Sequence, residues 1–168
     1  MSADPEALAH EQLVMGLCLA LAAEAGPEGV RRVQTHISSV LLAGPHAYKL
    51  KRPVRLPFLD FSSLALREAA CREELRLNRR TAAALYLDLL PITGSAQAPE
   101  IGGSGTPIEW VLRMRRFAAE DEWQVMAREG RLGPAHIDAL AEHLAGFHAG
   151  LPPLPLADAF RKSVWDWT

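Results

Sequence analysis

The segment from Val30 to Lys51 constrains the fold more than any other part of the chain. It is rich in β-branched residues and is interrupted at Gly44-Pro45, a pair that favours a turn. The pattern predicts three short strands, over about residues 30–35, 37–43 and 46–51. Because the connections are tight, we expect neighbouring strands to pair antiparallel.

Helical patterns lie on both sides of these strands. Residues 5–24 form one predicted helix, which ends before Gly26-Pro27. Residues 62–84 form a second, longer helix that Ser62 or Ser63 can cap. Its apolar residues spread over more than one face, which is typical of a helix packed between other elements.

The later part of the chain changes from strands to helices. Strands are predicted over 87–93 and 108–117, separated by a Gly/Pro/Ser-rich turn region over 94–107. After Phe117 the pattern is only helical, over residues 120–128, 136–148 and a short terminal helix over 157–168. This order of elements predicts an α+β fold with an antiparallel sheet of about five strands, one long packed helix and a helical end.

Charge is distributed unevenly along the chain. The net charge is −2, but Arg31 to Arg80 contains 11 Lys/Arg against 4 Asp/Glu, and the rest contains 7 against 16. An anionic ligand, or a solvated basic face opposite an acidic one, would each account for the basic segment. The apolar run 13–23 is too short to span a bilayer. Cys18 and Cys71 lack metal-ligand spacing and favour a reducing, cytoplasmic location.

Several separate blocks carry a resemblance to a known family. They occur in the family's order and run from about Val33 to His148: Thr35–Gly44, Ala47–Val54, Phe58–Ser62, Glu74–Arg80, Tyr86–Gly94, Met114–Phe117, Ala135–Leu140 and Phe147-His148. Together they resemble the aminoglycoside-phosphotransferase-like, kinase-like N-terminal half of a bacterial family that is usually fused to a C-terminal P-loop ATPase of the AAA type.

The resemblance implies a fold and a cofactor. The expected fold is a protein-kinase-like small lobe followed by the helical beginning of a large lobe, and therefore a truncated kinase. The corresponding parts are an N-terminal helix over 1–29, the small lobe over 30–117 and a partial large lobe over 118–168. The implied cofactors are ATP and Mg²⁺, bound weakly because no Gly-rich loop precedes the lysine candidates.

The lysine candidates lie on one predicted strand. Ala47, Lys49 and Lys51 share a face because side chains alternate along a strand. In a kinase-like site the small Ala47 leaves room for a flat base while Lys49 reaches the phosphates, with Lys51 as the alternate. The competing interpretation is that both lysines are edge-strand charges that discourage aggregation.

A carboxylate on the long helix should hold the lysine. The family block favours Glu74, whereas a helical wheel places Glu73 nearer the Leu66/Ala70/Leu77 stripe, so both stay candidates. The resemblance further implies that backbone near Met114 to Phe117, including Arg116, contacts the adenine. The turn at His36 to Ser39 would then cover the phosphates.

The sequence presents no complete catalytic loop. His136-Ile-Asp138 lacks the expected Asn, since that position is His143, and Asp138 suits a helix N-terminus. Asp158-Ala-Phe160 lacks the glycine of a metal-binding motif. We therefore expect no catalytic and no metal-ligating residue in this chain, and at most nucleotide binding.

Three hypotheses follow from these observations. The chain is a truncated kinase-like domain that binds nucleotide, a non-catalytic protein-interaction module on a degenerate kinase-like fold, or a fragment of a longer phosphotransferase. The expected partners are a nucleotide, and a second copy or a downstream segment that covers apolar residues such as Trp165 and Trp167. Neither nucleic acid nor a membrane is expected as a partner.

Overall fold

The computed structural model describes residues 5–153, and the chain divides into two compact units, Met1–Ala119 and Glu120–Thr168. The first unit contains the strands and the second contains helices, so the protein has a mixed α+β fold. The predicted terminal helix over 157–168, Asp158-Ala-Phe160, Trp165 and Trp167 lie outside the described residues.

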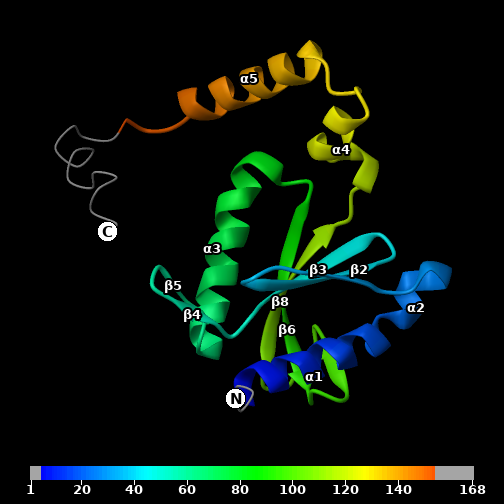
Figure 1. Ribbon diagram of the computed structural model, residues 1–168. Coiled ribbons are helices and arrows are strands. Elements are labelled where there is room, and N and C mark those ends of the chain that lie inside the picture. Colours follow the sequence, from blue (N-terminus) through cyan, green and yellow to red (C-terminus); the bar gives the residue numbers. More distant parts are fainter. Residues whose placement is uncertain (1–4, 154–168) are drawn as a thin grey trace. The chain divides into compact units, whose positions relative to one another are not determined.

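A six-stranded antiparallel sheet forms the centre of the first unit, in the order β1-β2-β3-β8-β6-β7 (Figure 1). Its strands are β1 (Arg31–Gln34), β2 (Ser38–Ala43), β3 (His46–Lys51), β6 (Tyr86–Gly94), β7 (Pro99–Ile101) and β8 (Glu109–Arg115). A separate two-stranded ribbon pairs β4 (Arg55–Leu56) with β5 (Leu59–Asp60). The three predicted N-terminal strands are confirmed.

The sheet has one strand more than expected, because β7 lies inside the region predicted to be a turn. β7 pairs only with the end of β6, through Ile92↔Ile101, Thr93↔Glu100 and Gly94↔Pro99. Gly94 and Gly102, at φ of 83° and 76°, reverse the chain on either side of it. Three residues at a sheet edge are too few to show an alternation of apolar and polar side chains. The surrounding glycines therefore made the sequence pattern predict a turn here.

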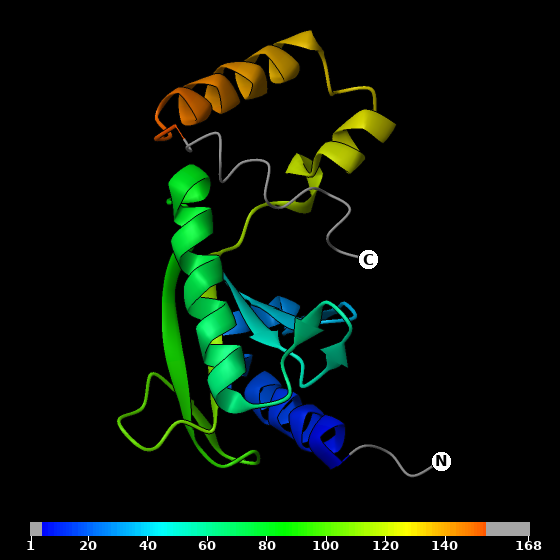
Figure 2. The same cartoon turned by 90° about the vertical axis from the view of Figure 1, so that its left-hand side faces the viewer.

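The helices of the first unit are α1 (Pro5–Ala20), the short α2 (Ala22–Ala25), the 3-10 turn η1 (Gly26–Glu28) and α3 (Leu64–Ala82). The predicted helix over 5–24 is therefore broken at Leu21. The Ser63 hydroxyl accepts a hydrogen bond from the Leu66 N–H, which confirms Ser63 as the cap of α3. Figure 2 shows α3 running lengthwise beside β6.

The apolar core lies between α1 and one face of the sheet. From α1 it takes Leu13, Val14 and Leu17, and from the sheet Leu41, Ala43, Tyr48, Leu50, Ile92 and Val111. Gly16 permits the close approach of α1 to the β6–β7 turn, since a Cβ there would lie 2.2 Å from the Ala96 carbonyl oxygen.

No single described helix combines the length and apolar character needed to cross a membrane. Only Pro5–Ala20 taken together with Ala22–Glu28, across a bend of 55°, meets that test by length and composition.

The described part of the second unit consists of α4 (Trp123–Arg128) and α5 (Pro134–Ala149), preceded by the 3-10 turn η2 (Ala119–Asp121). These helices match the two predicted over 120–128 and 136–148. The Arg131 guanidinium, after α4, donates to the Glu120 carbonyl at 2.6 Å and so links to the turn η2 before that helix. Ile137, Leu140 and Leu144 on α5 are all at least 40% exposed.

Candidate functional site

The two faces of β3 have opposite character. Tyr48 and Leu50 are buried in the core beneath α1. Side chains alternate along a strand, so Ala47, Lys49 and Lys51 project from the other face. α3 packs on strands β6 and β8 and brings Glu74 to these lysines. A buried strand of alternating apolar and basic residues therefore separates the core from a charged cluster.

Glu74 binds both lysines of β3. Its Oε1 accepts from the Lys49 Nζ at 2.6 Å, and its Oε2 accepts from the Lys51 Nζ. One carboxylate thus holds two ammonium groups. We call Lys49, Lys51 and Glu74 the lysine–glutamate cluster.

Burial and charge act in opposite directions on Glu74. Burial alone raises the pKa of its carboxyl group. The hydrogen bonds and positive charges of Lys49 and Lys51 lower it by a larger amount, so the net pKa lies below its ordinary value. The carboxylate is therefore ionised at neutral pH. It provides a fixed negative charge that orients both ammonium groups.

The two lysines differ in their access to solvent. The Lys51 side chain is 8% exposed, and its Nζ lies 5.2 Å from the centroid of the Phe61 ring, in a cation–π contact. The Lys49 side chain is 26% exposed. Lys51 is thus fixed inside the domain, whereas the Lys49 ammonium is the one that an external anion reaches more easily.

Glu73, the alternative carboxylate, does not face the lysines. It pairs on the surface with Arg76, one turn away, at 2.6 Å. The helical-wheel argument for Glu73 was wrong because Leu66 and Leu77, which defined the supposed buried stripe, are 42% and 41% exposed.

The side of α3 that meets the sheet is instead largely polar. Residues at helical spacing on it are Arg67, Cys71, Glu74 and Asn78. Arg67 pairs with Glu109 of β8, Cys71 is fully buried, and Glu74 binds the lysines. An apolar-periodicity rule cannot find such a face, and this is why the sequence left Glu73 and Glu74 unresolved.

Two residues near Glu74 were not anticipated. The Asn78 side-chain amide donates to the Glu74 backbone carbonyl at 2.8 Å. Tyr86, at the start of β6, lies close enough that the Glu74 carboxylate adds to the effect of burial in raising the pKa of its phenol. Tyr86 lies in the block Tyr86–Gly94 that carries part of the resemblance, and this was the only sequence signal for it.

Ala47 and Met114 lie opposite each other in neighbouring strands. They are paired in the register of β3 and β8, as Lys49 is with Leu112. Ala47 is 5% exposed, so neighbouring atoms cover its small side chain in this structure.

Arg116 points elsewhere. Its guanidinium lies 3.5 Å from both the Glu28 carboxylate and the Gly44 carbonyl oxygen, beside η1 and the β2–β3 turn. The Arg116 backbone N–H donates to the Pro45 carbonyl, and the Arg115 N–H to the Leu85 carbonyl. The Phe117 N–H has no hydrogen-bond partner among the described residues. Of this predicted adenine-contacting segment, Phe117 therefore retains an available donor.

The turn predicted to cover phosphates divides its serines between the two faces of the sheet. Ser39 lies on the α1 face, where its Oγ is 3.0 Å from the His10 Nε2. Ser38 pairs in register with Lys51 and lies on the lysine face. Its buried hydroxyl has no partner among the described residues. The Ser38 N–H donates a hydrogen bond to the Thr35 hydroxyl at 3.0 Å. The Ser39 hydroxyl, which lies on the α1 face, therefore does not belong to the phosphate cover expected from the turn at His36 to Ser39.

The basic segment is largely neutralised by local pairing. Beyond the lysine–glutamate cluster, its ion pairs are Arg32–Glu11, Arg55–Asp60, Arg67–Glu109, Arg72–Glu68 and Arg76–Glu73. The Arg52 guanidinium donates to the carbonyls of Thr35 and His36. Most of the basic side chains in this segment are thus paired with carboxylates, including carboxylates from outside the segment.

The second unit places His136-Ile-Asp138 within α5. The His136 Nδ1 accepts from the Gly133 N–H at 3.1 Å, which caps the helix. Asp138 is exposed in the following turn. Within residues 5–153, no group of three or more His, Cys, Asp or Glu side chains is placed to hold a metal ion.

The fold and the site together define an α+β protein whose antiparallel sheet carries a lysine–glutamate cluster under a long helix. The chain is 37% identical over 115 residues to uncharacterized proteins of Mycobacterium tuberculosis and Mycobacterium bovis. The match covers 68% of this chain and 22% of each mycobacterial protein, so it spans about a fifth of their length. No family model and no solved structure matches.

Proposed function

We propose that this chain is the N-terminal part of an aminoglycoside-phosphotransferase-like, ATP-dependent kinase-fold protein, and that its first unit binds an adenine nucleotide with Mg²⁺. The observation that carries the proposal is the bond between Lys49 on a central strand and Glu74 on the covering helix, at 2.6 Å. Kinase-type phosphate binding needs such a strand lysine, positioned by a helix glutamate.

The charge balance of the cluster supports an anionic ligand. Two ammonium groups face one carboxylate, so one positive charge is not balanced within the cluster. A phosphate oxygen at Lys49 would complete the balance through a charge-assisted hydrogen bond. Lys51 is less suited to this role because it is buried against Phe61.

The lysine face also offers a surface for a base. Ala47 is small and lies opposite Met114, and the Phe117 N–H downstream is available as a donor to a ring nitrogen. We propose that adenine lies against Ala47 and Met114 while its phosphates extend toward Lys49. A purine is favoured over a bare polyphosphate because these contacts are apolar and directional.

The proposal for this chain is binding without phosphoryl transfer. The only H-x-D triplet of the described residues, at His136, is part of a helix cap and its Asp138 is solvent-exposed. Since the mycobacterial relatives are several times longer, phosphoryl transfer by such a longer protein is a separate proposal. The acceptor would be a small molecule with a hydroxyl or amine.

A titration with a fluorescent ADP analogue and Mg²⁺ tests the proposal. We expect saturable binding that Lys49→Ala weakens at least tenfold and that Lys51→Ala weakens less than threefold, provided that both variants melt cooperatively. Absence of saturable binding to the wild-type chain would reject the proposal. Equal losses in the two variants would reject Lys49 as the phosphate ligand.

A protein-interaction module is the second candidate, and α5 favours it. Ile137, Leu140 and Leu144 recur at helical spacing and are at least 40% exposed. This function predicts no effect of nucleotide on the melting temperature and a concentration-dependent mass by light scattering. A monomer stabilised by MgADP would exclude it as the main function.

A further inference from the structure

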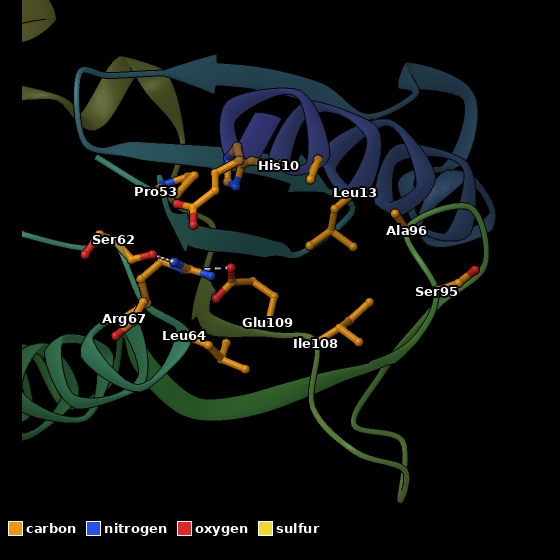
Figure 3. Close-up of a pocket in the computed structure, with 13 residues that line it drawn as sticks. His10, Leu13, Pro53, Ser62, Leu64, Arg67, Ser95, Ala96, Ile108 and Glu109 are labelled. Atoms are coloured by element: carbon orange, nitrogen blue, oxygen red, sulfur yellow. Dashed lines mark hydrogen bonds and ion pairs between the residues drawn. The ribbon is translucent and has the colours of Figure 1, made fainter. Parts of the chain in front are cut away.

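A pocket lies between α1 and the start of α3. It has a volume of about 470 Å³ and is lined by α1, the start of α3, the β6–β7 turn and the start of β8 (Figure 3). His10, which lines it, contacts Ser39, and Ser39 pairs in register with Leu50 of the apolar core. The volume is in the range of small-molecule sites.

One end of the pocket is a buried ion pair. The Arg67 Nε donates to the Glu109 Oε2 at 2.8 Å, and their side chains are 11% and 4% exposed. The Arg67 Nη1 donates to the carbonyls of Phe61 and Ser62, and the Glu109 Oε1 accepts from the Trp110 N–H. The Arg67 Nη2 has no hydrogen-bond partner within the described chain. A donor with free N–H groups thus lies beside a carboxylate with spare lone pairs.

His10 adds a second incompletely bonded group. The residue is 5% exposed, its Nε2 contacts the Ser39 hydroxyl, and its Nδ1 is buried with no partner in the described part of the chain. Burial is the main cause that lowers the pKa of His10 to about 4; Glu11 opposes the shift, and the nearby Arg52, Arg32 and Arg67 add to it. The ring is therefore neutral at pH 7. Leaving a buried nitrogen unbonded is unfavourable, so this end of the pocket is incompletely satisfied.

The remaining walls of the pocket combine apolar side chains with Ser62, Ser63, Ser95 and Glu6. Figure 3 shows Leu13, Leu64 and Ile108 around the same space as the polar side chains of His10, Arg67 and Glu109. Ile108 is 36% exposed and lies at the rim. An apolar body with one polar group fits this division.

We infer that this pocket binds a small neutral molecule with an apolar body and a carboxamide or lactam group. The polar end is electrically balanced, since Arg67 and Glu109 form a pair and His10 is uncharged. A charged ligand would bury an uncompensated charge there. Glu6 also lines the pocket and already has an interaction of its own. The adjacent donor of Arg67 and acceptor of Glu109 match the carbonyl and N–H of an amide.

Three probes of similar size test this inference by ligand-observed and protein-observed NMR: benzamide, benzoate and benzylamine, which are neutral, anionic and cationic. We expect saturable benzamide binding at least tenfold tighter than that of either charged probe, with a change in the His10 ring signals. Benzoate or benzylamine binding as tightly as benzamide would overturn the inference, and so would the absence of saturable benzamide binding.

A rim substitution locates the binding. Ile108→Trp, which fills the pocket, should weaken benzamide at least tenfold, whereas the control Ile137→Trp, at an exposed position of α5, should leave it unchanged. Leu64→Phe narrows the pocket from the start of α3 and replaces Ile108→Trp if that variant does not melt cooperatively. Unchanged affinity in the rim variant would place the binding elsewhere and reject the pocket. MgADP should not displace benzamide, so this test fails or succeeds independently of nucleotide binding.

Discussion

The two faces of the central sheet differ in what their side chains do for the fold. Beneath α1, Leu41, Leu50 and Val111 are fully buried in a continuous apolar core. Beneath α3, the same strands present Lys49, Lys51 and the carboxylate of Glu74. Apolar residues would hold a helix on a sheet at least as well as a buried ion pair. The charged face is therefore the part of the fold on which the proposed nucleotide binding rests.

The largest effect is expected on the α1 face. Leu50→Ala removes a fully buried side chain from the centre of the core and should lower the free energy of unfolding by about 2–5 kcal/mol. Urea titration followed by circular dichroism measures it. A loss below about 1 kcal/mol would show that this face does not carry the stability we assign to it.

The next effect is a pH dependence from His10, also on the α1 face. Its pKa is about 4 in the folded protein and 6.5 when solvated. The stabilisation from the neutral ring is therefore complete above pH 6.5 and is lost as the pH falls toward 4, by on the order of 3 kcal/mol. His10→Gln should remove this part of the pH dependence. Parallel curves for the wild type and His10→Gln between pH 6.5 and 4 would contradict the assignment.

A smaller effect is expected on the α3 face. Glu74→Gln keeps the shape of the side chain but removes the charge shared by two lysines, and should cost about 2 kcal/mol. Because the folded protein lowers the pKa of Glu74, its stabilisation is present above the ordinary value of 4.5 and disappears as the pH falls below it. Glu73→Gln, at the exposed neighbouring position, is the control and should melt like the wild type. Equal destabilisation by the two variants would contradict the role of Glu74 as the charge that holds both lysines.

The smallest effect distinguishes the two lysines. Lys51→Met retains an apolar contact with Phe61 and leaves Glu74 paired with Lys49, so it should cost about 1 kcal/mol or less. Nucleotide affinity should stay within threefold of the wild type. If Lys51→Met abolished binding in a protein that still folds, Lys51 would be the phosphate ligand and the greater exposure of Lys49 would be irrelevant.

The sequence predicted most of the fold, because its strands and helices have regular patterns and clear ends. The turn at Gly44-Pro45 and the cap at Ser63 were both found in this way. The edge strand Pro99–Ile101 and the ribbon of β4 and β5 were missed because two or three residues carry no measurable period. The break of the first helix near Leu21 was missed because the surrounding residues are all good helix formers.

The site was only partly predictable. Strand alternation placed Lys49 and Lys51 on one face, but no local rule separated Glu73 from Glu74, because the buried side of α3 is polar. The pocket had no sequence signal at all. Its key contacts join His10 to Ser39 and Arg67 to Glu109, residues 29 and 42 positions apart. Such pairs become visible only when the chain is folded.

The most direct test of the central claim is the contribution of phosphates to binding, measured by calorimetry with adenosine, AMP and ADP in the presence of Mg²⁺. The wild-type chain should bind ADP at least tenfold more tightly than adenosine. In Lys49→Met that ratio should fall close to one while adenosine affinity stays the same, because only the phosphate contact is lost. A ratio unchanged by Lys49→Met would contradict the account.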